Sequence, residues 1–148
     1  MELIYKIIIL LGILAGLLSY KKTKPIFLKL ILIGYVLIMS TIFFKEQFPI
    51  TIAFFSFGIL TFMFIIYSGI NKKWMSLLIG FIVFLSFSWS TMNWIGGNEI
   101  RLLSIIPILS FILILSNRKK YENELSILTI LSVYELTEFI ILIEQWND

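Results

Sequence analysis

Apolar residues in this chain form six long runs separated by short polar connections. The runs extend over residues 3–20, 26–44, 48–70, 74–94, 100–116 and 125–146. At about 1.5 Å per helical residue, each is long enough or nearly long enough to cross a hydrocarbon core about 30 Å thick. Lipid offers no hydrogen-bond partners to the backbone, so such runs must be helices or strands of a closed barrel, and their lack of alternation excludes the barrel. The pattern predicts an all-α integral membrane protein: residues 1–148 form a single domain, a bundle of six transmembrane helices.

Composition agrees with this pattern. The chain is 59% hydrophobic and 14% charged, whereas about a quarter of the residues of a soluble domain are charged. The net charge of +3 does not indicate a nucleic-acid partner, because the lysines lie in short clusters between apolar runs. We therefore expect the lipid bilayer to be the main partner. Low charge with abundant Ile, Phe and Lys favours a bacterial plasma membrane.

The basic residues predict the orientation of the bundle. Eight of them lie in the first, third and fifth connections: Lys21, Lys22, Lys24, Lys72, Lys73, Arg118, Lys119 and Lys120. The regions around the second and fourth connections hold only Lys45 and Arg101. Positively charged connections stay in the cytoplasm, so the odd connections are expected inside and both termini on the extracytoplasmic side.

Missing residue types exclude several kinds of enzyme. The chain has neither cysteine nor histidine, so Ser–His and Cys–His nucleophile pairs and His-ligated zinc sites cannot form. The only aspartate is Asp148, which also excludes paired-aspartate chemistry. No nucleotide-binding glycine motif is present. We expect no cofactor and no metal, and an enzyme is the less favoured class.

Two glutamates, Glu135 and Glu138, lie one helical turn apart within the last apolar run. A charged residue at the centre of a spanning helix costs about 3 kcal/mol on insertion scales, and such residues usually face the bundle interior. Two neighbouring carboxylates repel, so at least one is expected to carry a proton. The pair is either a hydrogen-bonded link between helices, a proton or cation site, or a contact to a partner or ligand. Glu144, near the outer surface, is expected to be solvated or paired with Arg101.

That helix is expected to span the membrane rather than to lie flat on its surface. A flat helix needs its polar residues on one face. Within the segment 125–146, the polar residues are instead distributed around the helix axis.

A polar stretch in the outer half of the fourth run is the second candidate site. Ser86, Ser90 and Asn93 have the spacing i, i+4, i+7 and share one helix face, which Trp89 borders. With Arg101 above them, they predict an outward-facing polar pocket for a small ligand. The alternative is plain packing, because serine often joins helices within membranes.

Two further signals concern packing. Gly12 and Gly16, four residues apart, predict a close contact with another helix. Pro107 falls near the middle of the fifth run and predicts a kink there.

Three functions remain open. The favoured one is a small membrane protein that binds or translocates a solute, an ion or a lipid, with the glutamate pair as its protonatable centre. The second is a non-catalytic subunit or immunity-type factor that binds another membrane protein or a membrane-active peptide; a homo-oligomer is also compatible with the sequence. The third is a small lipid-modifying enzyme that uses Glu138 as acid/base and Arg101 as an anion clamp.

Overall fold

The computed structural model describes residues 2–43, 47–92 and 96–147, and within this part the regular elements are all helices. The α-helices are α1 (Glu2–Leu18), α2 (Ile26–Ser40), α3 (Gln47–Ile70), α4 (Trp74–Thr91), α5 (Gly97–Arg101), α6 (Ile105–Ser116) and α7 (Leu125–Asn147). Short 3-10 turns follow four of them: η1 (Tyr20–Lys22), η2 (Thr41–Phe43), η3 (Leu102–Ser104) and η4 (Arg118–Tyr121). The helices occupy the predicted apolar runs, although the predicted ends at residues 44 and 94 fall outside the described residues.

Four helical segments are long and apolar enough to cross a membrane by length and composition: Leu3–Lys22, Thr51–Ile70, Glu99–Ser116 and Leu125–Trp146. The apolar helices Ile26–Ser40 and Trp74–Trp89 are shorter. Large apolar side chains also cover the outside of the bundle; Leu18, for example, is 84% exposed and Ile70 is 77% exposed. An apolar outer surface of this extent is typical of contact with lipid rather than with water.

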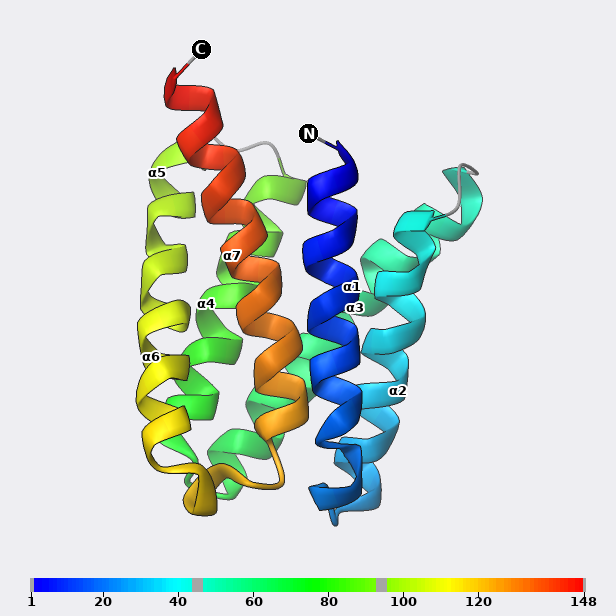
Figure 1. Ribbon diagram of the computed structural model, residues 1–148, viewed down its shortest axis with the longest axis vertical. Coiled ribbons are helices and arrows are strands. Elements are labelled where there is room, and N and C mark those ends of the chain that lie inside the picture. Colours follow the sequence, from blue (N-terminus) through cyan, green and yellow to red (C-terminus); the bar gives the residue numbers. More distant parts are fainter. Residues whose placement is uncertain (1, 44–46, 93–95, 148) are drawn as a thin grey trace.

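Helix α7 is at the centre of the bundle. It packs against α1, α2, α4 and α6, and in Figure 1 it lies between α1 and α6 with α4 behind it. Its side chains Ile127, Leu128, Leu131 and Leu142 are all fully buried. The helix that carries the two glutamates is therefore enclosed by its neighbours along much of its length.

The predicted close contact at Gly12 and Gly16 is confirmed, and its partner is α7. A Cβ atom on Gly12 would lie 2.6 Å from Val133 Cγ1, and one on Gly16 would lie 2.9 Å from Ile130 Cγ1. Glycine at both positions allows the backbones of α1 and α7 to approach closely.

Pro107 lies within the helical segment Glu99–Ser116, just after a short 3-10 turn, and the kink expected there stays a prediction. Pro107 lies in the first turn of α6, where a proline is well tolerated. Before it the chain forms the 3-10 turn η3 and, before that, the short helix α5. Proline has no N–H to donate to the carbonyl of Leu103, four residues earlier. The fifth apolar run is therefore helical throughout Glu99–Ser116, with a short 3-10 turn, η3, within it.

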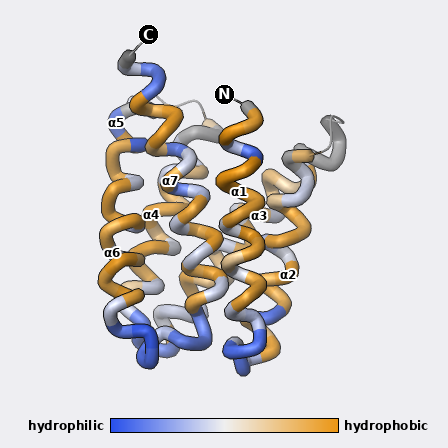
Figure 2. Tube along the Cα trace, in the orientation of Figure 1, coloured by the Kyte–Doolittle hydropathy of each residue, from blue (hydrophilic) through white to orange (hydrophobic). Residues whose placement is uncertain are grey.

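The two ends of the bundle differ in polarity. Both termini lie at one end (Figure 1), and the connections α1–α2, α3–α4 and α6–α7 lie at the other, hydrophilic end (Figure 2). Those connections contact one another: the Lys24 N–H donates to Asn123 Oδ1 at 3.1 Å, and the Lys73 ammonium donates to the carbonyl of Lys120.

Candidate functional site

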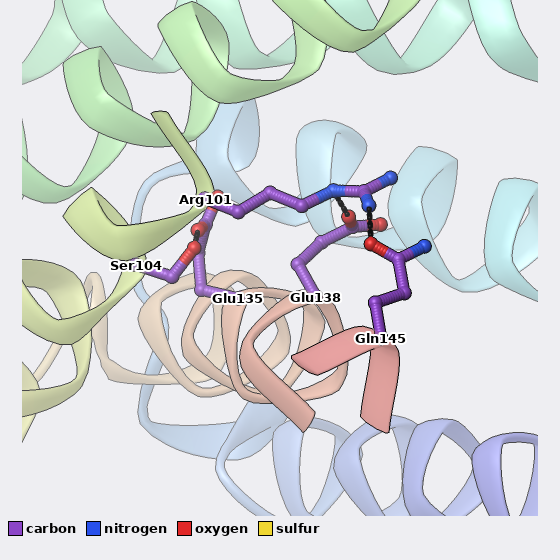
Figure 3. A network of polar contacts seen from close by, with 5 residues as sticks. All are labelled: Arg101, Ser104, Glu135, Glu138 and Gln145. Atoms are coloured by element: carbon purple, nitrogen blue, oxygen red, sulfur yellow. Dashed lines mark hydrogen bonds and ion pairs between the residues drawn. The ribbon is translucent and has the colours of Figure 1, made fainter. Parts of the chain in front are cut away.

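Glu135 is a fully buried carboxyl group on α7. The hydroxyl of Ser104 donates a hydrogen bond to its Oε2 atom, as Figure 3 shows. Its other oxygen, Oε1, has no hydrogen-bond partner among the described residues. Ser132, one turn earlier on α7, likewise has a buried Oγ without a partner in that part of the chain. Two unsatisfied oxygens therefore follow each other along α7 at i, i+3 spacing.

Ser104 contacts Glu135 from the 3-10 turn within the fifth apolar run. It is the last residue of η3, immediately before α6, and it is fully buried against α7. Ser104 was not among the site residues predicted from the sequence. A hydroxyl residue three positions before a proline within an apolar run was the signal that could have identified it, because a proline interrupts the helical hydrogen bonding in that region.

Glu138 lies one turn further along α7 and forms an ion pair. Arg101 Nε is 3.2 Å from Glu138 Oε2, and the two side chains are 22% and 17% exposed, respectively. The same guanidinium donates through Nη1 to Oε1 of Gln145 at 3.2 Å (Figure 3). The hydroxyl of Tyr134 is a further hydrogen-bond partner of Glu138. Arg101, Glu138, Tyr134 and Gln145 thus form one polar network, with Glu135 next to it.

Of the two expectations for Glu144, the pairing with Arg101 is wrong, while the side chain is partly exposed. Glu144 instead accepts a hydrogen bond from the hydroxyl of Tyr5 on α1, while Arg101 pairs with Glu138. The reason is position on the helix: α5 meets α7 beside Glu138 and Gln145, whereas Glu144 faces α1.

The predicted polar face of α4 is described only in part. Ser86 is buried, and Trp89 is half-buried. Asn93 and the side chain of Ser90 lie outside the described residues. A polar pocket formed by these four residues therefore remains a prediction. Of the candidate site residues, Arg101 and Glu138 are in direct contact.

The chemistry available at this site is that of two neighbouring carboxyl groups, one of which pairs with Arg101. In residues 2–43, 47–92 and 96–147 no group of three or more His, Cys, Asp or Glu side chains is arranged to hold a metal ion. Glu138 has Arg101 as its counter-ion. Among the described residues, Glu135 receives the neutral hydroxyl of Ser104 and its Oε1 atom has no partner, so that atom is able to accept a proton or to contact a small cation.

Comparisons of the chain with protein-family models, with curated proteins and with solved structures find no match.

Proposed function

We propose that this chain is a six-helix membrane protein that binds and passes a proton or a small monovalent cation, with Glu135 as the binding group. The observation that carries the proposal is the free oxygen of this carboxyl group. Glu135 is fully buried, and its Oε1 atom has no hydrogen-bond partner within the described part of the chain.

The energetic argument concerns the missing counter-ion. Burying an ionised carboxylate costs several kcal/mol even after the surroundings relax, about 3 kcal/mol or more at the centre of a membrane. Arg101 is already paired with Glu138 at 3.2 Å. A proton or a bound cation at Glu135 removes the uncompensated charge, and its release restores that charge. The site is therefore able to take up and release a positive charge.

The 3-10 turn beside Glu135 supports the same proposal, because it places a hydroxyl group against the buried carboxyl group. Here α5 and η3 precede Pro107, and Ser104 in η3 contacts Glu135. The Ser132 hydroxyl, on the side of Glu135 nearer the basic end, offers a next oxygen along the path.

The six apolar runs are proposed to cross the membrane with the three basic connections in the cytoplasm and both termini outside. Clustering of Lys and Arg in those connections supports this orientation, and all three lie at the end of the bundle opposite the termini. Arg101 and Glu138 are then on the extracytoplasmic side of Glu135.

The ion pair also bears on the alternative of a subunit that binds another membrane protein. In that alternative a partner supplies an Arg or a Lys to the glutamates. Arg101 of the same chain already supplies the cation for Glu138, so no partner is needed to compensate it. This contact favours an ion-binding protein over a subunit recognised through Glu138.

Flux measurements on the purified chain in liposomes test the proposal. We expect the wild type to dissipate an imposed pH, sodium or potassium gradient, with each gradient tested separately to identify the ion. Glu135→Gln keeps the shape of the side chain and removes its charge, so flux should fall at least tenfold. Glu122→Gln, at an exposed glutamate of the α6–α7 connection, is the matched control and should behave as wild type.

Two results contradict the proposal. One is wild-type flux no greater than that of empty liposomes for all three gradients. The other is unchanged flux in a Glu135→Gln variant that purifies with the same elution profile as the wild type.

A further inference from the structure

Polar side chains are paired on the outer side of Glu135 and left unpaired toward the basic end of the bundle. On the outer side Glu138 pairs with Arg101, and Gln145 accepts a hydrogen bond from the same guanidinium. Among the described residues, the buried side-chain atoms without a hydrogen-bond partner are Ser68 Oγ, Ser76 Oγ, Glu124 Oε2, Ser132 Oγ and Glu135 Oε1. Apart from Glu135 itself, these residues lie between Glu135 and the basic end. Buried polar atoms without a protein partner are commonly satisfied by water, so the structure favours entry of water from that end.

Ser68 and Ser76 lie at the basic end, where α3 ends and α4 begins. Both side chains are fully buried. A Cβ atom on Gly69 of α3 would lie 3.3 Å from Leu77 of α4, so Ser68 and Ser76, each one residue earlier, lie within one helical turn of the same level. Two hydroxyl groups without a partner in the described part of the chain are thus buried beside the α3–α4 connection.

Glu124 brings a carboxyl group to the same connection. It is the last residue before α7 and is 1% exposed. The Lys73 ammonium, in the α3–α4 connection, and the Tyr67 side chain, in the last turn of α3, are near enough to interact electrostatically with its carboxyl group. Glu124 therefore lies against the part of α3 and α4 that carries the two serines.

The charged surroundings of Glu124 leave one of its oxygens free for a proton. Lys73 donates to the carbonyl of Lys120 and lies 5.4 Å from the centroid of the Tyr121 ring, while Oε2 of Glu124 has no partner among the described residues. The titratable side chains of the surrounding elements are Tyr67 on α3, Lys73 in the α3–α4 connection, Lys120, Tyr121 and Glu122 in the α6–α7 connection, and Lys24 in the α1–α2 connection, whose N–H donates to Asn123. Burial raises the pKa of Glu124 above 4.5, and the Lys73 ammonium partly offsets the rise. This carboxyl group therefore exchanges its proton nearer to neutral pH than an exposed glutamate does.

One row of α7 leads from Glu124 toward Glu135. Glu124, Leu128 and Ser132 follow each other at i, i+4, i+8, and Glu135 is three residues further on, about 16 Å from Glu124 along the axis. Leu128 is fully buried and separates the two polar ends of the row. A closely packed layer of this kind admits a transient file of water more readily than a hydrated metal ion.

We propose that the path to Glu135 opens at the basic end, where Glu124 exchanges protons with the cytoplasm through water held by Ser68 and Ser76. This assignment rests on the proposed function and names the proton as the ion that the path carries. A hydronium ion gives one proton to the Glu124 carboxylate and leaves as water. The carboxyl group then gives that proton to water on the side of Ser132 and becomes a carboxylate again.

Proton flux in liposomes tests Glu124 as the entrance. Glu124→Gln should slow the flux at least about tenfold, because removal of a group that transfers protons commonly costs more than that. Glu124→Asp keeps a carboxyl group and should retain most of the wild-type rate. Ser68→Ala/Ser76→Ala should cause a smaller loss than Glu124→Gln, and the exposed Glu122→Gln should match the wild type.

Infrared difference spectra of the purified chain give a second measurement that does not depend on flux. As the pH is raised from 4.5 to neutral, the C=O stretching band of a protonated Glu124 should disappear, and this band should be missing from Glu124→Gln but present in Glu122→Gln. Ser68→Ala/Ser76→Ala should shift the frequency of the band, because the water bound to the carboxyl group is lost.

The outcomes separate this assignment from the proposed function. Flux that is lost in Glu135→Gln but unchanged in Glu124→Gln overturns the entrance at Glu124 and leaves the proposed function standing. Sodium or potassium flux without proton flux overturns the choice of the proton. A Glu124 band that is identical in Ser68→Ala/Ser76→Ala overturns the water shared with the serines. Absence of all flux in the wild type overturns the proposed function and, with it, the role of Glu124 in a path. If Glu124→Gln does not elute like the wild type, the flux of the serine double variant, which keeps every carboxyl group, decides: a rate equal to wild type overturns the proposal.

Discussion

Arg101 Nε lies 3.2 Å from Oε2 of Glu138 and joins α5 to α7. One turn away, Glu135 receives the hydroxyl of Ser104. Two glutamates that look equivalent in the sequence therefore occupy different environments. Glu138 is part of an ion-paired network near the end of the bundle, whereas Glu135 is a carboxyl group in the interior without a counter-ion among the described residues.

Breaking the ion pair from either side should destabilise the protein. Arg101→Gln leaves Glu138 without its cation, and Glu138→Gln leaves Arg101 without its anion. Loss of one partner costs about 3–5 kcal/mol for a fully buried pair; both side chains here are partly exposed, so we expect about 1–3 kcal/mol. The free energy of unfolding in mixed micelles measures this loss of stability.

The double variant Arg101→Gln/Glu138→Gln should be more stable than the sum of the two single changes predicts, because neither charge is left unpaired. Lys119→Gln, at an exposed lysine of the α6–α7 connection, serves as the control. Strict additivity of the two single changes would show that the contact contributes nothing to stability.

The Ser104–Glu135 contact predicts a second non-additive pair. Ser104→Ala removes the hydroxyl donor of a buried carboxyl group, which costs about 1–3 kcal/mol. In a Glu135→Leu background that acceptor is gone, so the same change should cost less than about 1 kcal/mol. The free energy of unfolding of the four proteins measures the difference. An equal cost of Ser104→Ala in both backgrounds would mean that the hydroxyl stabilises η3 and not Glu135.

The contact between α1 and α7 predicts a steric effect at Gly12. A Cβ atom there would lie 2.6 Å from Cγ1 of Val133 and 2.8 Å from its Cβ, and a β-branched side chain cannot easily move away. Gly12→Ala should therefore destabilise the bundle by about 1–3 kcal/mol, the usual cost of overpacking.

Ala15→Leu, on the exposed side of the same helix, should leave the unfolding transition unchanged. Combining Gly12→Ala with Val133→Ala should recover part of the stability lost in Gly12→Ala, since the clashing methyl groups of Val133 are removed. A Gly12→Ala variant as stable as the wild type would disprove the close contact.

Glu124, at the basic end just before α7, predicts a dependence of stability on pH. Burial raises the pKa of its carboxyl group above the ordinary value of 4.5, and the nearby Lys73 ammonium partly offsets the rise. Its Oε2 atom has no partner in the described part of the chain. Because the folded-state pKa is the higher one, the stability linked to this group is present below about pH 4.5 and is lost as the pH rises through the raised pKa.

Melting temperatures measured from pH 4.5 upward should therefore decrease more steeply for the wild type than for Glu124→Gln. The exposed neighbour Glu122 provides the control, and Glu122→Gln should keep the slope of the wild type. Parallel curves for the wild type and Glu124→Gln would show that Glu124 titrates alike in the folded and unfolded states.

The sequence by itself determined which stretches of the chain form helices. Length and hydrophobicity are properties of each run taken alone, because a backbone in an apolar phase must satisfy its hydrogen bonds within the segment. The close contact at Gly12 and Gly16 was also predictable, since it depends on residue size at one spacing. Their partner was not, because any helix of the bundle was available.

The tertiary structure decided the pairings between helices that are distant in the sequence. It brought α1 to α7 and set Arg101 beside Glu138 rather than Glu144. It also placed Ser104, in the 3-10 turn before Pro107, against Glu135. These outcomes depend on how all the helices pack together, and no single segment contains that information. The separate environments of the two glutamates follow from that packing, although both residues lie on one continuous helix.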